Sequence, residues 1–180
     1  MLKRWTKESS RIVTENPWWT YRLDRFRIPG GAQGEYHFVD SRGSSMVVPV
    51  DGDGRLLLVN QYRYLCDRES VEFPCGGVKE GRTHAEMAAI ELEEETGHSA
   101  ERLVEAGTFN PFNGVTNEMC RVYIARGLRP SDRRPDETEE FELLRCTPDE
   151  VDALITAGTI WDGMSLAAWC IVKPKLRSNE

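Results

Sequence analysis

The stretch that decides the fold is Gly76–Gly97, GGVKEGRTHAEMAAIELEEETG, which reads as a glycine-rich loop, one short helix and a stop signal. Thr83 and Glu86 have the three-residue spacing of a capping box, which places the start of the helix. Gly97 stands where a left-handed C-terminal cap is expected. The sequence therefore predicts a helix over roughly residues 84–96.

Projected at about 100° per residue, this helix has an apolar stripe next to an acidic face. The residues expected to be buried are Ala85, Ala89, Leu92 and Thr96. Glu91, Glu94 and Glu95 share the neighbouring face, while Glu93 points elsewhere. Like charges at this spacing repel, and a hard divalent cation would offset the repulsion because Mg²⁺ prefers oxygen ligands. The alternative is an ordinary solvated acidic face.

These residues resemble the Nudix box, whose pattern is Gly, five residues, Glu, seven residues, then Arg-Glu-aliphatic-x-Glu-Glu-x-Gly-aliphatic. The positions that match are Gly76, Glu91, Leu92, Glu94, Glu95 and Gly97. Arg82 stands in place of the first Glu, Ile90 in place of the Arg, and His98 in place of the last aliphatic residue. In the family the loop Glu and the helix Arg help to fix the loop against the helix, so these departures bear on catalytic strength.

The resemblance implies an α/β fold, namely a Nudix-type α/β/α sandwich with a mixed β-sheet and an N-terminal β-hairpin extension. The alternation of expected strands and helices after residue 46 agrees with such a sandwich. We expect residues 1–45 to form the strand and hairpin extension, which in the ADP-ribose pyrophosphatase branch helps to form a dimer. Residues 46–180 are then the Nudix catalytic domain, and the two parts make a single structural domain overall.

The same resemblance implies the metal and catalytic residues. Gly76, Glu91, Glu94 and Glu95 are the expected metal site, with Mg²⁺ as the cofactor and Mn²⁺ as its alternative. Glu94 is expected to act as ligand or as general base. In the family a Glu from a later loop can also act as the base or as a ligand, and here Glu139 or Glu140 in the charged, breaker-rich segment 129–140 takes that place. Their alternative role is a solvated loop.

Substrate-binding residues are expected on three other segments. Trp18 and Trp19, with Tyr21, are candidates for stacking on a base, and packing in a core or dimer interface is the alternative. Arg63 is a candidate phosphate contact because a guanidinium fork suits phosphate oxygens, although it could equally form a surface salt bridge. Glu118 matches the Glu that ends a pocket loop in the branch.

Composition excludes several classes of protein. The chain has 180 residues with 39% hydrophobic and 29% charged content and a net charge of −7, which suits a globular protein and argues against binding a nucleic-acid backbone. No apolar run reaches membrane-spanning length, and the N-terminus lacks the apolar segment of a signal peptide. The five cysteines are scattered without a Cys-x-x-Cys pair, which is typical of reduced thiols in a cytoplasmic protein.

The sequence thus predicts a cytoplasmic, homodimeric, metal-dependent pyrophosphohydrolase. Its expected substrate is a small nucleotide, either ADP-ribose or a related nucleoside diphosphate derivative, cleaved to a nucleoside monophosphate and a phosphorylated moiety. A catalytically weakened nucleotide-binding or regulatory protein with the same fold is the alternative, motivated by Arg82 and Ile90. A third possibility is an acidic interaction protein whose glutamates are only solvated.

Overall fold

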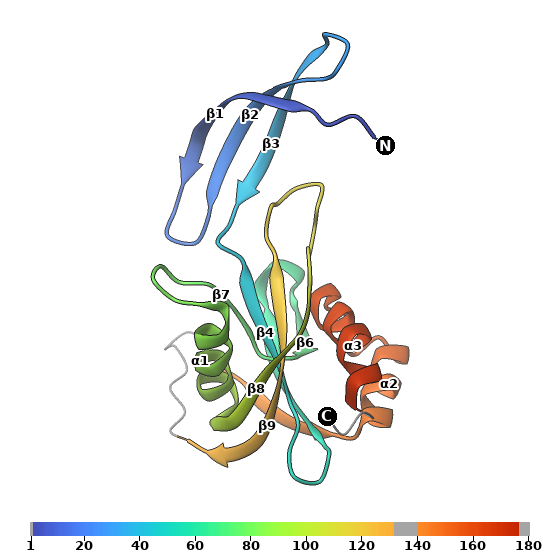
Figure 1. Cartoon of the computed structure of the whole chain (residues 1–180). Helices are drawn as coiled ribbons and strands as arrows, with labels where there is room; N and C mark the ends of the chain where they lie inside the picture. The colour runs from blue at the N-terminus through green and yellow to red at the C-terminus, as the bar shows by residue number, and fades with distance from the viewer. Residues whose placement is uncertain (1, 132–139, 177–180) are drawn as a thin grey trace. The chain divides into compact units, whose positions relative to one another are not determined.

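The computed structural model describes residues 2–131 and 140–176. The chain divides into two compact units, of which the first contains Met1–Gly43 and Asn110–Met119 and the second contains Ser44–Phe109 and Cys120–Glu180. The segment Asn110–Met119, which we expected to be a loop of the catalytic domain, therefore groups with the N-terminal strands. Figure 1 labels many of the elements of the two units.

The N-terminal unit is an antiparallel sheet in the order β1–β2–β3, formed by Thr6–Glu15, Thr20–Arg27 and Gln33–Asp40. Trp5 stacks on Phe26, with ring centroids 4.4 Å apart. Residues 6–10 pair with β2 and belong to β1. Strand β2 begins at Thr20, after a turn in which the Asn16 side chain accepts hydrogen bonds from the amides of Trp18 and Trp19.

The second unit contains two sheets. One has the order β7–β4–β9–β8, with strands Cys75–Gly77, Ser44–Pro49, Cys120–Pro130 and His98–Phe109. It is mixed because β4 and β9 run parallel whereas the other pairs are antiparallel. The other sheet has the order β10–β5–β6, with strands Glu142–Cys146, Leu56–Arg63 and Arg68–Glu72. A short 3₁₀ turn, Tyr64–Cys66, connects β5 and β6.

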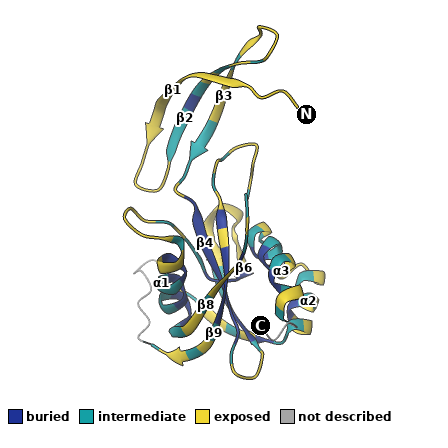
Figure 2. Cartoon of the chain, viewed as in Figure 1, coloured by how far each residue is buried: buried dark blue, intermediate teal, exposed yellow. Residues whose placement is uncertain are grey.

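In the described part of this unit three helices cover the sheets: α1, His84–Thr96; α2, Pro148–Thr156; and α3, Gly163–Leu176. Ala88 and Leu92 of α1 pack on Val47, Tyr123 and Ala125 of the sheet. The larger core contains residues of β4, β5 and β9 together with residues of α2 and α3. In Figure 1 α1 lies on one side of β4, β8 and β9, and α2 and α3 lie on the other, which is the α/β/α arrangement expected. Figure 2 shows the burial of β4 between these layers.

One expectation about α1 was wrong in part. Leu92 and Thr96 are buried as expected, but Ala85 is exposed and Ala89 is only half-buried. The buried residues of α1 are Met87, Ala88, Glu91, Leu92, Glu95 and Thr96. The projection ranked positions by polarity, whereas the sheet and β7 together cover a wider part of the helix that includes two of the glutamates.

Candidate active site

Local hydrogen bonds fix both ends of α1. The Thr83 side chain accepts from the Glu86 amide at 3.2 Å, and the Thr83 amide donates to Glu86 Oε2 at 2.7 Å, so both halves of the predicted capping box are present. Gly97 adopts a left-handed conformation with φ of 67° and donates its amide to the Glu93 carbonyl. The predicted start and end of the helix are confirmed. Because α1 is a regular helix between them, Glu91 and Glu95 lie one turn apart.

Glu91 and Glu95 lie one turn apart on α1, only 9% and 5% exposed. Both face the short strand β7. A Cβ built on Gly76 would lie within 2.7 Å of both carboxylate oxygens of Glu91. The amide of Cys75 donates to Glu95 Oε1 at 3.4 Å. A residue with a side chain would not fit at position 76, because the Glu91 carboxylate occupies the space that the side chain would need.

The two buried carboxylates and the adjoining β7 backbone suit a hard divalent cation. Burying two negative charges is costly, and a cation bound by oxygen ligands offsets that cost. Among residues 2–131 and 140–176, no three His, Cys, Asp or Glu side chains converge into a complete metal site. Mg²⁺ does not need such a cage, since it commonly takes one or two carboxylates and completes its shell with waters and substrate phosphates. Glu94, the third expected ligand, is half-buried.

The Gly76 contact makes a specific prediction. Gly76→Ala should weaken Mg²⁺ affinity or metal-dependent turnover by about 10–100-fold, because the new methyl group displaces the Glu91 carboxylate. Gly77→Ala is the matched control, since a Cβ at Gly77 meets nothing within 4 Å. Calorimetric Mg²⁺ titration of both variants measures the effect. Equal affinities for the two variants would contradict the role given to Gly76.

Arg63 and Glu72 form an ion pair on one face of the β5–β6 hairpin. Arg63 Nε donates to Glu72 Oε1 at 2.8 Å, and Arg63 Nη2 donates to Glu72 Oε2. Glu72 is 3% exposed, whereas the Arg63 side chain is 46% exposed. The hydrogen bonds to Glu72 raise the pKa of Arg63, and the negative charges of Asp162 and Glu95 contribute to the rise. Arg63 was considered as a phosphate contact or as part of a salt bridge, and the structure contains the salt bridge. Its hydrogen bonds to Glu72 come from Nε and Nη2 and not from Nη1.

Two residues that hold this region together, Asp162 and Ser165, were not among the candidates chosen from the sequence. The Phe73 amide, between β6 and β7, donates to Ser165 Oγ at 3.1 Å. Asp162 caps α3 by accepting from the Ser165 amide at 2.8 Å. Together they tie the strand that leads into Gly76 to the first turn of α3. The only available signal was an Asp and a Ser three residues apart before an apolar run, which marks many helix starts.

The thiol of Cys75, next to Gly76, is expected to be unreactive. A hydrogen bond with Cys120 and burial raise the pKa of Cys75, and burial raises the pKa of Cys146. A raised pKa leaves less of the reactive thiolate at pH 8. A thiol reagent should therefore label the exposed Cys66 and Cys170 first. The other three cysteines should be labelled only when the protein unfolds. Peptide mapping after brief labelling tests this, and rapid modification of Cys75 would contradict it.

The remaining site candidates belong to other segments of the chain. Trp18 is 83% and Trp19 is 42% exposed in the turn between β1 and β2. Glu118 is half-buried in the N-terminal unit, where its carbonyl accepts from Asn110 Nδ2 at 2.7 Å. Glu140 is exposed just before β10, and Glu139 lies outside the described residues. The roles assigned to these five residues stay predictions.

The three departures from the box have simple surroundings. Arg82 is exposed and lies 4.0 Å from Glu86 in an i,i+4 ion pair. Ile90 is half-buried on α1, one turn after Glu86. His98 begins β8, with Nδ1 2.7 Å from the carbonyl oxygen of Thr96.

A family model, described as the NUDIX domain, matches residues 40–167 of the chain. The chain belongs to the Nudix family. The expected identity as a Nudix hydrolase and the expected sandwich fold are thereby confirmed. A solved structure described as an ADP compounds hydrolase has the same fold, with a TM-score of 0.85 at 20% identity over 98% of this chain and 96% of that one.

Curated relatives of this Nudix hydrolase carry several names. An ADP-ribose pyrophosphatase of Bacillus subtilis is 29% identical and covers 81% of this chain and 80% of its own. A CMP-5'-(N-acetyl-N-hydroxy-3-aminopropyl)phosphonate hydrolase of Streptomyces rubellomurinus is also 29% identical, covering 94% of this chain and 82% of its own. A methanol dehydrogenase activator of Bacillus methanolicus is 28% identical, covering 82% and 80%. Separately, none of the described helices is long and apolar enough to cross a membrane.

Proposed function

We propose that this Nudix hydrolase is a metal-dependent pyrophosphohydrolase that cleaves ADP-ribose or a related nucleoside diphosphate derivative to a nucleoside monophosphate and a phosphorylated moiety. The observation that carries the proposal is the burial of Glu91 and Glu95 against β7, where Gly76 leaves room for a carboxylate. Two relatives named ADP-ribose pyrophosphatase support the choice of substrate class.

Each residue of the site has a proposed task. Glu91 and Glu95 hold Mg²⁺, or Mn²⁺ as the alternative, and the backbone at Gly76 lies beside them. When bound, the cation neutralises charge on the diphosphate oxygens. Glu94 is a further ligand or the group that accepts a proton from the attacking water, and Glu139 or Glu140 are the alternatives for that proton.

Arg63 can bind a substrate phosphate while it keeps its hydrogen bonds to Glu72. A guanidinium has five N–H donors, and the pair with Glu72 engages Nε and Nη2. Nη1 therefore keeps its donors for a phosphate oxygen, while Glu72 holds the planar group in a fixed orientation. Trp18, Trp19 and Glu118 are the residues that we propose for the nucleoside end of the substrate.

A substrate panel tests the proposal. ADP-ribose, nucleotide sugars, dinucleotides and a CMP-linked phosphonate are each incubated with the enzyme and Mg²⁺, Mn²⁺ or EDTA, and the products are separated by chromatography. We expect turnover that requires a divalent cation and yields a nucleoside monophosphate. Absence of cation-dependent turnover on every compound would reject the proposal and favour the nucleotide-binding alternative.

That alternative rests on the two replaced box residues and can be tested directly. Arg82→Glu alone brings a second carboxylate beside Glu86, and Ile90→Arg alone adds a cation without its loop partner. The two changes together restore the complementary pair, so turnover of the double variant should exceed the value expected from adding the two single effects. A double-mutant cycle on kcat/KM measures the coupling, and strictly additive effects would show that the two positions are independent.

The proposed enzyme is a cytoplasmic homodimer. Leu23 is the one buried hydrophobic side chain among the described residues of the N-terminal unit, and all ten residues of β1 are exposed. A three-stranded sheet is stable only when one of its faces is packed against apolar side chains. A long edge strand with unpaired backbone groups also tends to pair with another chain. A second copy of the chain would supply that cover, and analytical ultracentrifugation would measure it.

A further inference from the structure

Two arginines lie directly opposite each other in the sheet. Arg102 of β8 and Arg126 of β9 are register partners, next to the pair formed by Val104 and Ile124 on the same face. Like charges directly opposite in an antiparallel pair are destabilising. The chain has 30 acidic and 23 basic residues, so it has more than enough carboxylates to pair with every basic side chain. The facing arginines are therefore not explained by a lack of acidic residues.

The two arginines line a pocket of about 350 Å³ together with Lys175 of α3. Lys175 Nζ donates to the Ala106 carbonyl, which leaves two of its three donors. The carboxylate in the lining, Glu105, already pairs with Arg121 at 3.2 Å. Within the part of the chain that the structure describes, no carboxylate forms an ion pair with Arg102 or Arg126. The pocket is thus left with an excess of positive charge.

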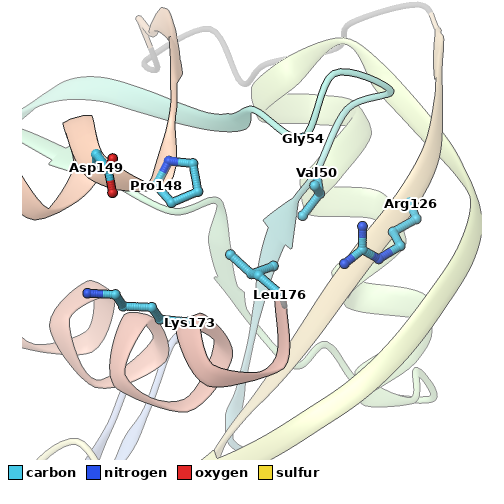
Figure 3. Close-up of a pocket in the computed structure, with 7 residues that line it drawn as sticks. All are labelled: Val50, Gly54, Arg126, Pro148, Asp149, Lys173 and Leu176. Carbon is cyan, nitrogen blue, oxygen red and sulfur yellow. The ribbon is translucent and has the colours of Figure 1, made fainter. Parts of the chain in front are cut away.

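Arg126 also borders a second, smaller cavity of about 170 Å³ between β9 and the ends of α2 and α3. Figure 3 shows Arg126 extending from β9 toward Leu176 at the end of α3, whereas Lys173 points away from Arg126. Lys173 is engaged elsewhere, with Nζ 2.6 Å from Asp152 Oδ2. Asp149 also lines this smaller cavity, but among the described residues it forms no ion pair with Arg126. The uncompensated charge therefore lies on Arg126 and its partner Arg102.

This pocket is separate from the glutamates of α1. Ile124, which lines the pocket, belongs to the core packed against α2 and α3. Its strand neighbours Tyr123 and Ala125 point the other way and pack against α1. Because successive side chains of a strand face opposite sides of the sheet, the arginine pocket and the candidate active site lie on opposite faces.

We propose that this pocket binds a small phosphate-bearing anion. An anion placed between the two guanidinium groups would turn their repulsion into attraction, and the fork of an arginine matches the oxygens of a phosphate. Lys175 adds a third cation from the facing helix. The volume falls in the range of small-molecule sites and exceeds that needed for an ion alone, so a sugar phosphate also fits.

Thermal unfolding of the full chain tests the proposal. Inorganic phosphate and D-ribose 5-phosphate are the probes, in buffer with EDTA, so that no cation at the glutamates can bind them, and with ionic strength matched by sodium chloride. At tenfold above its dissociation constant, a bound probe should raise the Tm by about 3–5 °C. The two probes are then compared at one equal concentration. A larger rise with ribose 5-phosphate would identify an organic phosphate as the ligand class, and an equal rise would identify phosphate itself.

The variants locate the effect. Arg102→Gln and Arg126→Gln should each abolish the phosphate-dependent rise, and in phosphate-free, low-salt buffer each should melt no lower than the wild type, because repulsion is removed. Arg126→Lys keeps the charge without the fork and should give a smaller rise. Arg129→Gln is the matched control, since Arg129 lies on the same strand but pairs with Glu101. No rise beyond that of chloride, or an equal rise in Arg126→Gln, would overturn the proposal.

Discussion

Glu95→Gln should lower kcat on the best substrate by at least about 10³-fold. Glu95 is 5% exposed beside β7, and its Oε1 accepts from the Cys75 amide. The amide side chain keeps the shape but removes the negative charge that holds the cation. Loss of the transition-state stabilisation that a metal supplies costs several kcal/mol, and about 4 kcal/mol corresponds to that factor. Steady-state kinetics across a range of Mg²⁺ concentrations measure the change.

The control for this experiment lies on the same helix. Glu93→Gln removes one negative charge from the same turn of α1, but Glu93 lies on a different face from Glu91 and Glu95. We expect kcat of this variant to stay within about threefold of the wild type, because the half-buried Glu93 does not share the face of the proposed metal ligands. If Glu93→Gln and Glu95→Gln lost activity equally, the general acidity of the helix would be the cause and the site assignment would fail.

Arg63→Ala should lower the free energy of unfolding by about 2–3 kcal/mol. The change leaves the carboxylate of Glu72, which is 3% exposed, without its guanidinium partner. Breaking a fully buried pair costs about 3–5 kcal/mol, and the value expected here is smaller because water reaches the half-exposed Arg63 side chain. Urea denaturation followed by tryptophan fluorescence gives the change in free energy.

Two comparisons distinguish a buried ion pair from a general loss of charge. Adding Glu72→Gln to Arg63→Ala should recover part of the stability, because the uncompensated charge is gone. Arg25→Ala breaks the exposed pair with Glu35 and should cost only about 0.2–1 kcal/mol. A loss for Arg63→Ala as small as that for Arg25→Ala would mean that Glu72 is solvated when Arg63 is absent.

The ends of α1 could be predicted from the sequence because they depend on contacts between near neighbours. The capping box joins residues three apart, and the Gly97 cap closes on Glu93. A contact of the same local kind begins α2, where Thr147 and Glu150 form a capping box. The Nudix pattern also identified the family, because Glu91, Glu94 and Glu95 stand at the positions that the pattern requires. A regular helix then places these residues close together.

The surroundings of the glutamates were decided by the tertiary structure. The helical projection identified an acidic face but placed the buried stripe beside it, because polarity alone does not show that β7 covers Glu91 and Glu95. Arg63 was a possible phosphate ligand or surface salt bridge until the hairpin register placed it on the same face as Glu72. Arg102 and Arg126 are 24 positions apart, and only the pairing of β8 with β9 makes them neighbours.

Sequence by itself therefore determined the limits of α1 and the family of this protein, because hydrogen bonds within a few residues and a fixed spacing encode them. The tertiary structure alone decided which charges are buried, which are paired and which face each other. Those properties depend on contacts between strands and helices far apart along the chain, where strand order and register set the distance between any two side chains.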